Sequence, residues 1–186
     1  MKNNPTQPGN FLEKASAYKL LFVLLCGLFI ADQLSKSWII GRPDLPLGSY
    51  WPYGGMEIIP GFFYIAHVGN RGAAWGLFAG YGFRLGLLAI GALVAIYYFR
   101  NELALRRLYM QVAFGLLCGG ILGNLVDRML RGHVVDFLDF HLPGYRWPAF
   151  NLADSGICIG ITGYVIFNFS EIWSESRKKQ PPDSSS

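Results

Sequence analysis

Four stretches of the chain are apolar for long enough to cross a bilayer as helices. They are about residues 18–40, 83–99, 108–125 and 155–173. A helix needs about 20 mostly apolar residues to span the hydrocarbon core of a membrane. The first stretch could instead be the core of a signal peptide, because Lys14 and Lys19 precede it. No A-x-A-like cleavage site follows, and apolar residues resume at Leu34 and Trp38, which favours an uncleaved helix.

The connection between the first two stretches has a pattern typical of a small β structure. Short strand-like runs at 56–59 and 62–66 flank the Pro60-Gly61 pair, which indicates a turn. Aromatic residues such as Tyr53 suit a sheet at the level of lipid headgroups. We therefore predict an all-α membrane core of four transmembrane helices. A small extramembrane β-structured segment at about 44–78 is predicted on its outer face.

The positions of Lys and Arg predict the orientation in the membrane. Nine of the 16 lie in three segments: the N-terminal residues up to Lys19, the loop after the second helix, and the C-terminal tail. Cytoplasmic loops are rich in Lys and Arg, so both termini are predicted to be cytoplasmic and the two longer connections to face outward. This predicts one membrane domain at 18–173 between tails at 1–17 and 174–186. The second tail is Pro/Ser-rich and is predicted to be disordered.

Composition excludes several classes of protein. With 52% hydrophobic and 15% charged residues, the chain is unlike a soluble domain. A net charge of +4 does not provide the dense basic face of a nucleic-acid binder. Cys26, Cys118 and Cys158 occur singly in apolar stretches, so no disulfide framework or cysteine metal site is predicted. The three histidines have no metal-ligand spacing either, and no metal or organic cofactor is predicted.

Polar residues beside the apolar stretches are the first candidates for chemistry, because charged groups next to hydrocarbon are costly. Asp32 and Lys36 lie one turn apart on the first helix, which is the spacing of an ion pair. Asn70 and Gly72 belong to a segment that is polar and then small in side chain. That segment is either a site of close backbone approach or a plain loop into the second helix.

The third helix carries a row of glycines that leads to a polar cluster. The row consists of Gly115, Gly119 and Gly123. Small residues at every fourth position favour tight helix packing in lipid. Asp127 continues the same row, and Asn124 and Arg128 are also one turn apart. Asp127 and Arg128 are thus either a structural anchor or part of the chemistry.

Two further segments carry carboxylates in contrasting surroundings. Asp136 and Asp139 lie among apolar residues, which would favour a protonated carboxyl, and spacing does not choose between them. Asn151 is a natural N-cap for the fourth helix, and the helix dipole would favour an ionised Asp154. Capping alone could explain both of those residues. Two carboxylates in such different environments are also the components of acid/base catalysis.

Five blocks in this order resemble the lipoprotein signal peptidases, also called signal peptidase II. They are residues 31–36 (ADQLSK), 70–76 (NRGAAWG), 123–128 (GNLVDR), 134–137 (VVDF) and 150–155 (FNLADS). The resemblance covers about residues 18–173. Trp75 stands where many members of that family have Phe, and the stretch at 42–55 is longer and richer in Pro and Gly than expected.

The resemblance implies a membrane-embedded aspartic endopeptidase of the bacterial inner membrane, with its active site near the outer face. It would remove signal peptides from diacylglyceryl-modified prolipoproteins by cleaving before the lipidated cysteine. The implied catalytic residues are Asp136 and Asp154. The implied substrate-binding or supporting residues are Asn70, Gly72, Asn124, Arg128, Asn151, Asp32, Lys36 and Asp127. Because one chain supplies both aspartates, a monomer is predicted, with membrane lipid and the prolipoprotein as its partners.

Two other classes of function compete with this interpretation. Buried carboxylates also build proton relays, so the chain could be a small proton-coupled carrier. The acidic residues cluster at the predicted outer edge, however, which disfavours a relay across the membrane. The glycine row is equally compatible with a non-catalytic anchoring protein. An Asp136→Asn variant separates these classes, since only a peptidase would lose hydrolysis.

Overall fold

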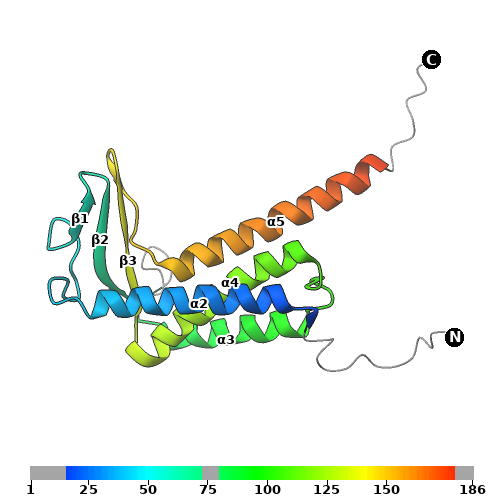
Figure 1. Ribbon diagram of the computed structural model, residues 1–186, viewed down its shortest axis with the longest axis horizontal. Coiled ribbons are helices and arrows are strands. Elements are labelled where there is room, and N and C mark those ends of the chain that lie inside the picture. The colour runs from blue at the N-terminus through cyan, green and yellow to red at the C-terminus, as the bar shows by residue number, and fades with distance from the viewer. Residues whose placement is uncertain (1–15, 73–79, 179–186) are drawn as a thin grey trace, which may run out of the picture.

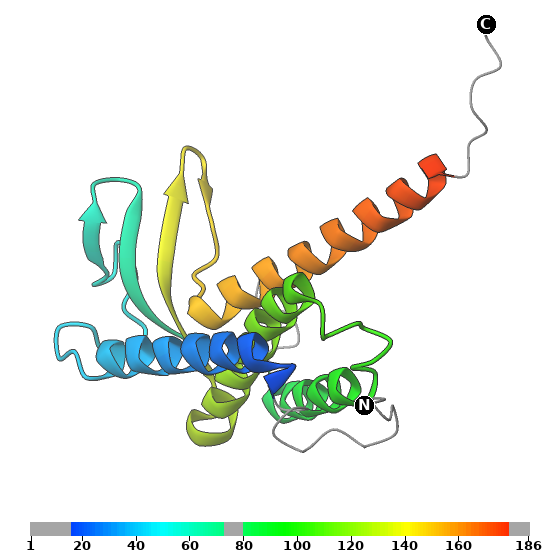
Figure 2. The same cartoon turned by 45° about the vertical axis from the view of Figure 1, so that its right-hand side comes forward.

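The computed structural model describes residues 16–72 and 80–178, which form a helical bundle with a small sheet at one end (Figure 1). The elements in chain order are α2 (Lys19–Ile40), β1 (Met56–Ile59), β2 (Phe63–Asn70), α3 (Gly82–Tyr98), α4 (Leu108–Arg131), β3 (Val134–Leu142), β4 (Tyr145–Arg146) and α5 (Leu152–Lys178). The central helix is α4, which packs against the other three helices. Both views place the sheet where α2 ends and α5 begins (Figures 1 and 2).

Three of the helices are long and apolar enough to cross a membrane. They are Lys19–Ile40, Leu108–Arg131 and Leu152–Ser174. The fourth, α3, is also apolar but has 17 residues. Large apolar side chains such as Leu34, Leu88 and Ile166 are exposed on the outer sides of α2, α3 and α5. Such surfaces require a lipid environment, so a membrane protein of helices with a small antiparallel sheet is confirmed.

The helix α4 continues beyond its predicted end at residue 125. In its polar last turns Asp127 and Arg131, at i and i+4, form an ion pair, which adds to the stability of the helix. The helix ends at Gly132, whose φ of 73° is the left-handed conformation that glycine adopts at helix ends. The helix α5 begins at Leu152, three residues earlier than predicted, directly after Asn151. Both extensions bring polar residues of the sequence blocks onto helices.

The glycines of α4 allow it to lie directly against α2. A Cβ at Gly115 would come within 2.9 Å of the Leu21 carbonyl oxygen, and one at Gly119 within 2.8 Å of the Leu25 carbonyl oxygen. Both distances are shorter than atoms can tolerate without a shift of the backbone. On its other side, α4 meets α5 at Gly120, where a Cβ would be 2.3 Å from a backbone oxygen. The predicted glycine face is therefore the contact between α2 and α4.

Replacing a glycine of this face should destabilise the bundle. We expect Gly119→Ala to reduce the free energy of unfolding by about 1–3 kcal/mol, because the added methyl would force α2 and α4 apart. The matched control is Gly91→Ala in α3, where a Cβ would meet nothing within 4 Å. Thermal unfolding in detergent compares the two variants. An equal melting temperature for both would contradict this packing.

The sheet brings together strands from two distant parts of the chain. Its order is β1-β2-β3-β4, with antiparallel neighbours. Along the β2–β3 pair, Val68 lies opposite Asp136 and Asn70 opposite Val134. Val135 is buried in a cluster with Ile39 of α2 and other apolar residues. Because side chains alternate along a strand, Asp136 points to the other face of β3.

The stretch at 42–55, which departed from the family pattern, folds back onto β2. Ser49 pairs with His67 through a β-bridge, and the His67 ring contacts the Leu45 carbonyl oxygen at 2.8 Å. The second strand is longer than the predicted run at 62–66 and ends at Asn70. The tail predicted to be disordered from residue 174 begins as helix, because α5 continues to Lys178. Residues 73–78 of the predicted β segment, residues 1–15 of the first tail and residues 179–186 of the second lie outside the described residues.

Candidate active site

The first candidate carboxylate, Asp136, is held on β3 by two amide side chains. Asn151 Nδ2 donates to Oδ1 at 2.7 Å, and Asn70 Nδ2 donates to Oδ2 at 3.0 Å. Asn70 can reach it because it lies on β2 diagonally across from Asp136, on the same face of the sheet. Asp136 is only 2% exposed. Both of its oxygens are therefore oriented before any substrate binds.

The second candidate, Asp154, lies in the first turn of α5. Its backbone N–H donates to Asn151 Oδ1 at 2.9 Å, and its Oδ2 accepts the backbone N–H of Asn151 at 3.3 Å. This reciprocal pair is a capping box, so the predicted cap is present. Its other oxygen accepts a hydrogen bond of 2.7 Å from Asn124 Nδ2. Asn151 thus contacts both aspartates, and capping does not remove Asp154 from the site.

Both aspartates line one pocket of about 620 Å³. The other polar side chains in its wall belong to Asn70, Asn124, Arg128 and Ser155, and Gly72 also lines it. Much of the remaining wall is apolar and comes from β3, the segment after β4, and α5; examples are Phe140, Trp147 and Ile157. Such a pocket can bind an apolar chain and present two carboxyl groups to a bond within it.

The surroundings of Asp136 favour its protonated form. Burial, followed by the negative charge of Asp154, raises the pKa of Asp136 to about 7. The hydrogen bonds from Asn70 and Asn151 act in the opposite direction but do not offset the burial. At neutral pH the pocket can therefore hold a carboxylic acid that donates a proton.

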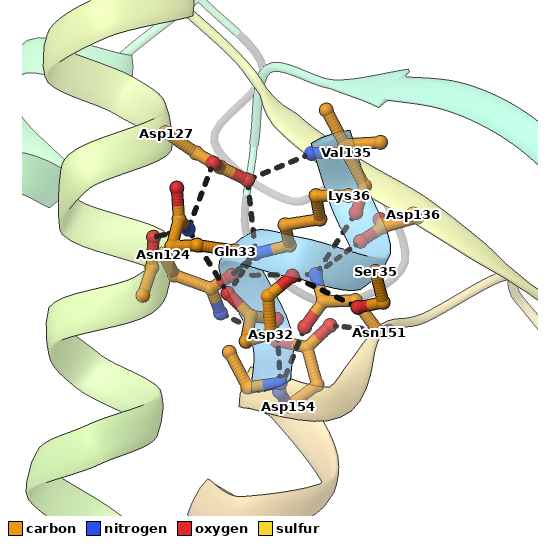
Figure 3. A network of polar contacts seen from close by, with 12 residues as sticks. Asp32, Gln33, Ser35, Lys36, Asn124, Asp127, Val135, Asp136, Asn151 and Asp154 are labelled. Carbon is orange, nitrogen blue, oxygen red and sulfur yellow. Dashed lines mark hydrogen bonds and ion pairs between the residues drawn. The ribbon is translucent and has the colours of Figure 1, made fainter. Parts of the chain in front are cut away.

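Behind the pocket lies a fully buried ion cluster centred on Lys36 (Figure 3). Lys36 Nζ is 2.8 Å from Asp32 Oδ2 and 2.9 Å from Asp127 Oδ2. It also donates to Asn124 Oδ1 at 3.1 Å, which turns the amide nitrogen of Asn124 toward Asp154. The predicted Asp32–Lys36 ion pair is confirmed, as part of a larger cluster.

Each aspartate of this cluster also holds the backbone next to a pocket aspartate. Asp127 Oδ2 accepts the N–H of Val135 at 3.1 Å, one residue before Asp136. Asp32 Oδ1 accepts the N–H of Ala153 at 3.0 Å, one residue before Asp154. The cluster therefore ties β3 and α5 to α2 and α4 directly beneath the two pocket carboxylates.

Arg128 and Asp127, adjacent in the sequence, do not pair with each other. Consecutive residues of a helix point about 100° apart, so Asp127 faces Lys36 and Arg131 while Arg128 turns toward the pocket. The Arg128 guanidinium donates to the carbonyl oxygens of Gly72 at 3.0 Å and Asn124 at 3.1 Å. Within the described residues its buried Nε has no hydrogen-bond partner.

The segment at 70–72 is shaped by this contact. Gly72 N–H donates to Asn70 Oδ1 at 2.9 Å, while Asn70 Nδ2 holds Asp136. Arg128 therefore stabilises the turn that orients the Asn70 amide, and the segment is more than a plain loop. The rest of that sequence block, Ala73 to Gly76 with Trp75, lies outside the described residues.

The structure separates Asp139 from the pocket. Residues three apart on a strand point to opposite faces, so Asp139 is directed away from Asp136. Its oxygens accept hydrogen bonds from Arg146 Nε at 3.1 Å and Nη2 at 2.7 Å, and His141 Nε2 lies 3.2 Å away. Spacing left the choice between the two aspartates open, and the strand decides it.

Sequence reasoning missed several residues of the site. Gln33 Nε2 contacts the carboxylates of Asp32 at 3.1 Å and Asp127 at 3.3 Å. Arg131 forms an ion pair with Asp127, and the i, i+4 spacing of these two residues could have predicted that pair from the sequence. Trp147 in the pocket wall had no such signal, since its place depends on the β3–β4 hairpin. Among residues 16–72 and 80–178, no three His, Cys, Asp or Glu side chains are grouped to hold a metal.

Comparison with known proteins agrees with this site. The family model described as "Signal peptidase (SPase) II" matches residues 24–170. The lipoprotein signal peptidase of Oleidesulfovibrio alaskensis is 42% identical over 150 residues, which cover 74% of this chain and 86% of that protein. That of Bacillus pumilus is 36% identical over 144 residues, covering 77% and 86%.

Solved structures agree as well. One, described as a bacterial membrane enzyme solved by the in meso method at 2.3 Å, has a TM-score of 0.72 and 34% identity, covering 89% of this chain and 94% of that one. A second, at 1.9 Å, has a TM-score of 0.67 and 38% identity, covering 78% and 90%. The resemblance noted in the sequence is confirmed. The chain belongs to the signal peptidase II family and is a membrane peptidase.

Proposed function

We propose that this peptidase cleaves the bond before the lipidated cysteine of diacylglyceryl-modified prolipoproteins, with Asp136 and Asp154 as its catalytic pair. Removal of signal peptides from prolipoproteins follows from membership of the family. The observation that supports the catalytic pair is geometric. The two carboxylates come from β3 and α5, line one largely apolar pocket, and are both contacted by Asn151.

The mechanism requires the two aspartates to share one proton. We assign this proton to Asp136, because burial and the negative charge of Asp154 raise its pKa to about 7. Asp154 then acts as general base and takes a proton from a water molecule, whose oxygen attacks the scissile carbonyl carbon. Asp136 donates a hydrogen bond to the carbonyl oxygen as charge develops there. When the C–N bond breaks, the leaving amine receives a proton from the pair, and the pair returns to one shared proton.

Neighbouring residues maintain this geometry. Asn70 and Asn151 orient Asp136, while Asn124 orients Asp154. Arg128 and Gly72 line the same pocket as the pair. In this proposal they contact the substrate backbone. Asp32, Lys36 and Asp127 act from behind through Asn124 and the backbone N–H groups of Val135 and Ala153. This list matches the residues implied by the family resemblance.

The test is incubation of the purified protein with a diacylglyceryl-modified prolipoprotein, followed by mass analysis of the products. We expect one cut, before the lipidated cysteine. The same prolipoprotein without lipid should be cut much more slowly, because it loses its positioning in the membrane plane. Equal rates for the two substrates, or a cut elsewhere, would contradict the proposed specificity.

Four helices are proposed to cross the inner membrane, with both termini cytoplasmic and one chain forming the enzyme. At a rise of about 1.5 Å per residue, α3 is about 25 Å long, which is near the lower limit for a span. Four crossings bring the start of α2 and the end of α5 to the same side, and the sheet lies at the other end of the bundle (Figure 1). The positive-inside rule then supports a position of the pocket at the outer face of the membrane.

Reporter fusions test this topology. Fusions at Arg106 and Lys178 should report the cytoplasm, because nine of the 16 Lys and Arg residues lie in the N-terminal, α3–α4 and C-terminal segments. A fusion near Gly55 should report the outer side. A reporter at Lys178 found on the outer side would rule out four crossings.

The pKa of Asp136 predicts a pH-dependent cost in stability. A raised carboxyl pKa means that the folded protein binds this proton between about pH 4 and 7 while the unfolded chain releases it. Stability from this group is therefore present at low pH and lost as the pH rises toward 7. The Asp136→Asn variant has no carboxyl group at this position, so its stability does not fall in this way. The melting temperature of the variant minus that of the wild type should therefore increase from pH 4 to pH 8. A constant difference across that range would contradict the raised pKa.

A further inference from the structure

We propose that Asp139 and Arg146 form a clasp that fixes an apolar wall of the pocket and thereby sets the affinity for substrate. The clasp is a bidentate pair, with Arg146 Nε and Nη2 at 3.1 and 2.7 Å from the two oxygens of Asp139. Asp139 is fully buried, although it plays no part in the proposed chemistry. Bidentate Arg–carboxylate pairs combine strength with a defined geometry, which suits a positioning role.

The clasp connects the β3–β4 hairpin to two segments that are distant in the sequence. Asp139 is on β3, and Arg146 is on β4 across the hairpin. The Arg146 guanidinium also lies 4.6 Å from the ring centroid of Tyr50, in the stretch before β1. His141 contacts Asp139, and its ring lies 4.6 Å from that of Tyr64 on β2. A change at either member of the pair would therefore loosen the whole hairpin.

The segment directly after Arg146 forms the pocket wall. Trp147, Pro148 and Ala149 all line the pocket, together with Phe140 of β3. The Trp147 N–H donates to the Phe140 carbonyl oxygen at 2.9 Å, so the wall segment after β4 lies alongside β3. Arg146 is the last residue of β4, so the wall segment begins directly after the clasp. Since the wall is apolar, it would contact an apolar chain of the substrate, either an acyl chain of its lipid or a side chain near the cleaved bond.

Neither Asp139 nor Arg146 is among the residues that line the pocket. The clasp is therefore a positioning device, and its loss should change binding rather than chemistry. This inference rests on the proposed active site. It differs from that proposal in its kinetic signature, because the catalytic pair controls kcat whereas the clasp controls KM.

The experiment measures kcat and KM of Asp139→Asn and Arg146→Gln on the diacylglyceryl-modified prolipoprotein. We expect KM to rise about tenfold in each variant while kcat changes by less than about twofold. The double variant should be no worse than either single one, because both changes open the same clasp. The matched control is Arg42→Gln. It breaks the bidentate pair of Arg42 with Asp44, which is exposed and does not contact the wall.

A second substrate with shortened acyl chains identifies the chain that the wall contacts. If the increase in KM disappears with this substrate, the wall holds an acyl chain; if it persists, the wall holds a peptide side chain. Should Asp139→Asn fail to fold, Arg146→Gln carries the test, since Arg146 is partly exposed. An unchanged KM in the folded variants would overturn the clasp, as would a loss of kcat with KM unchanged. Turnover by Asp136→Asn would instead overturn the proposed active site.

Discussion

Asparagine in place of Asp136 or Asp154 is expected to reduce prolipoprotein cleavage by at least about three orders of magnitude. An amide of nearly the same shape keeps one of the two oxygens that accept hydrogen bonds from Asn70, Asn124 or Asn151, but it cannot share or transfer the proton. Folding and substrate binding should therefore survive. Because the two carboxylates act as a unit, the double variant should be scarcely worse than either single variant.

The measurement is the cleavage rate at saturating substrate and matched amounts of folded protein. Asp44→Asn is the control, because Asp44 is an exposed carboxylate in the stretch before β1, paired with Arg42. Asp139→Asn should also keep most of its kcat, since that side chain points away from the pocket. Substantial turnover by Asp154→Asn, or a dead but folded Asp139→Asn protein, would refute the assignment of the pair.

Replacing Lys36 by Met should cost the most stability of any single change in the site. The substitution would leave Asp32 fully buried and without a cation, whereas Asp127 would keep Arg131. Removing one partner of a buried ion pair typically costs about 3–5 kcal/mol. The same change also frees the Asn124 amide that orients Asp154, so activity should fall even in the molecules that remain folded.

The matched control for this change is Lys19→Met, which removes an exposed lysine from the same helix. Adding Asp32→Asn to Lys36→Met should recover part of the lost stability, because no uncompensated charge then stays buried. Thermal unfolding and the yield of folded protein in detergent report both effects. A Lys36→Met protein with the same melting temperature as the wild type would show that the ion cluster does not stabilise the fold.

Most of the helical architecture could be predicted from the chain alone. Apolar runs long enough to cross a bilayer have few alternatives to a helix, because unpaired backbone groups are costly in lipid. The glycine row on α4 likewise predicted its tight packing, since only a missing side chain permits backbones to approach so closely. The candidate aspartates could also be predicted, because their carboxyl groups lie among apolar residues and because they belong to the five blocks of the family resemblance.

The choice among these carboxylates needed the tertiary structure. Asp136 and Asp139 are equivalent in local sequence, and only the pairing of β3 with β2 directs the first to the pocket and the second to Arg146. In the same way, Asp127 has Arg128 beside it in sequence but pairs with Lys36, 91 positions earlier, and with Arg131. Adjacency in the sequence does not predict such ion pairs, because the direction in which a side chain leaves its helix or strand determines which charged group it contacts.

The pocket itself also depended on contacts between distant segments. The sheet joins the connection between α2 and α3 to the one after α4, and strand pairing over such a separation has no local signal. The pocket wall at Trp147 and the ion cluster around Lys36 both depend on the packing of these distant segments against one another. The sequence by itself determined the membrane helices, their close packing and the chemical groups available. Only the tertiary structure decided which carboxylates face one pocket, because their positions depend on contacts among α2, α4, α5 and the sheet.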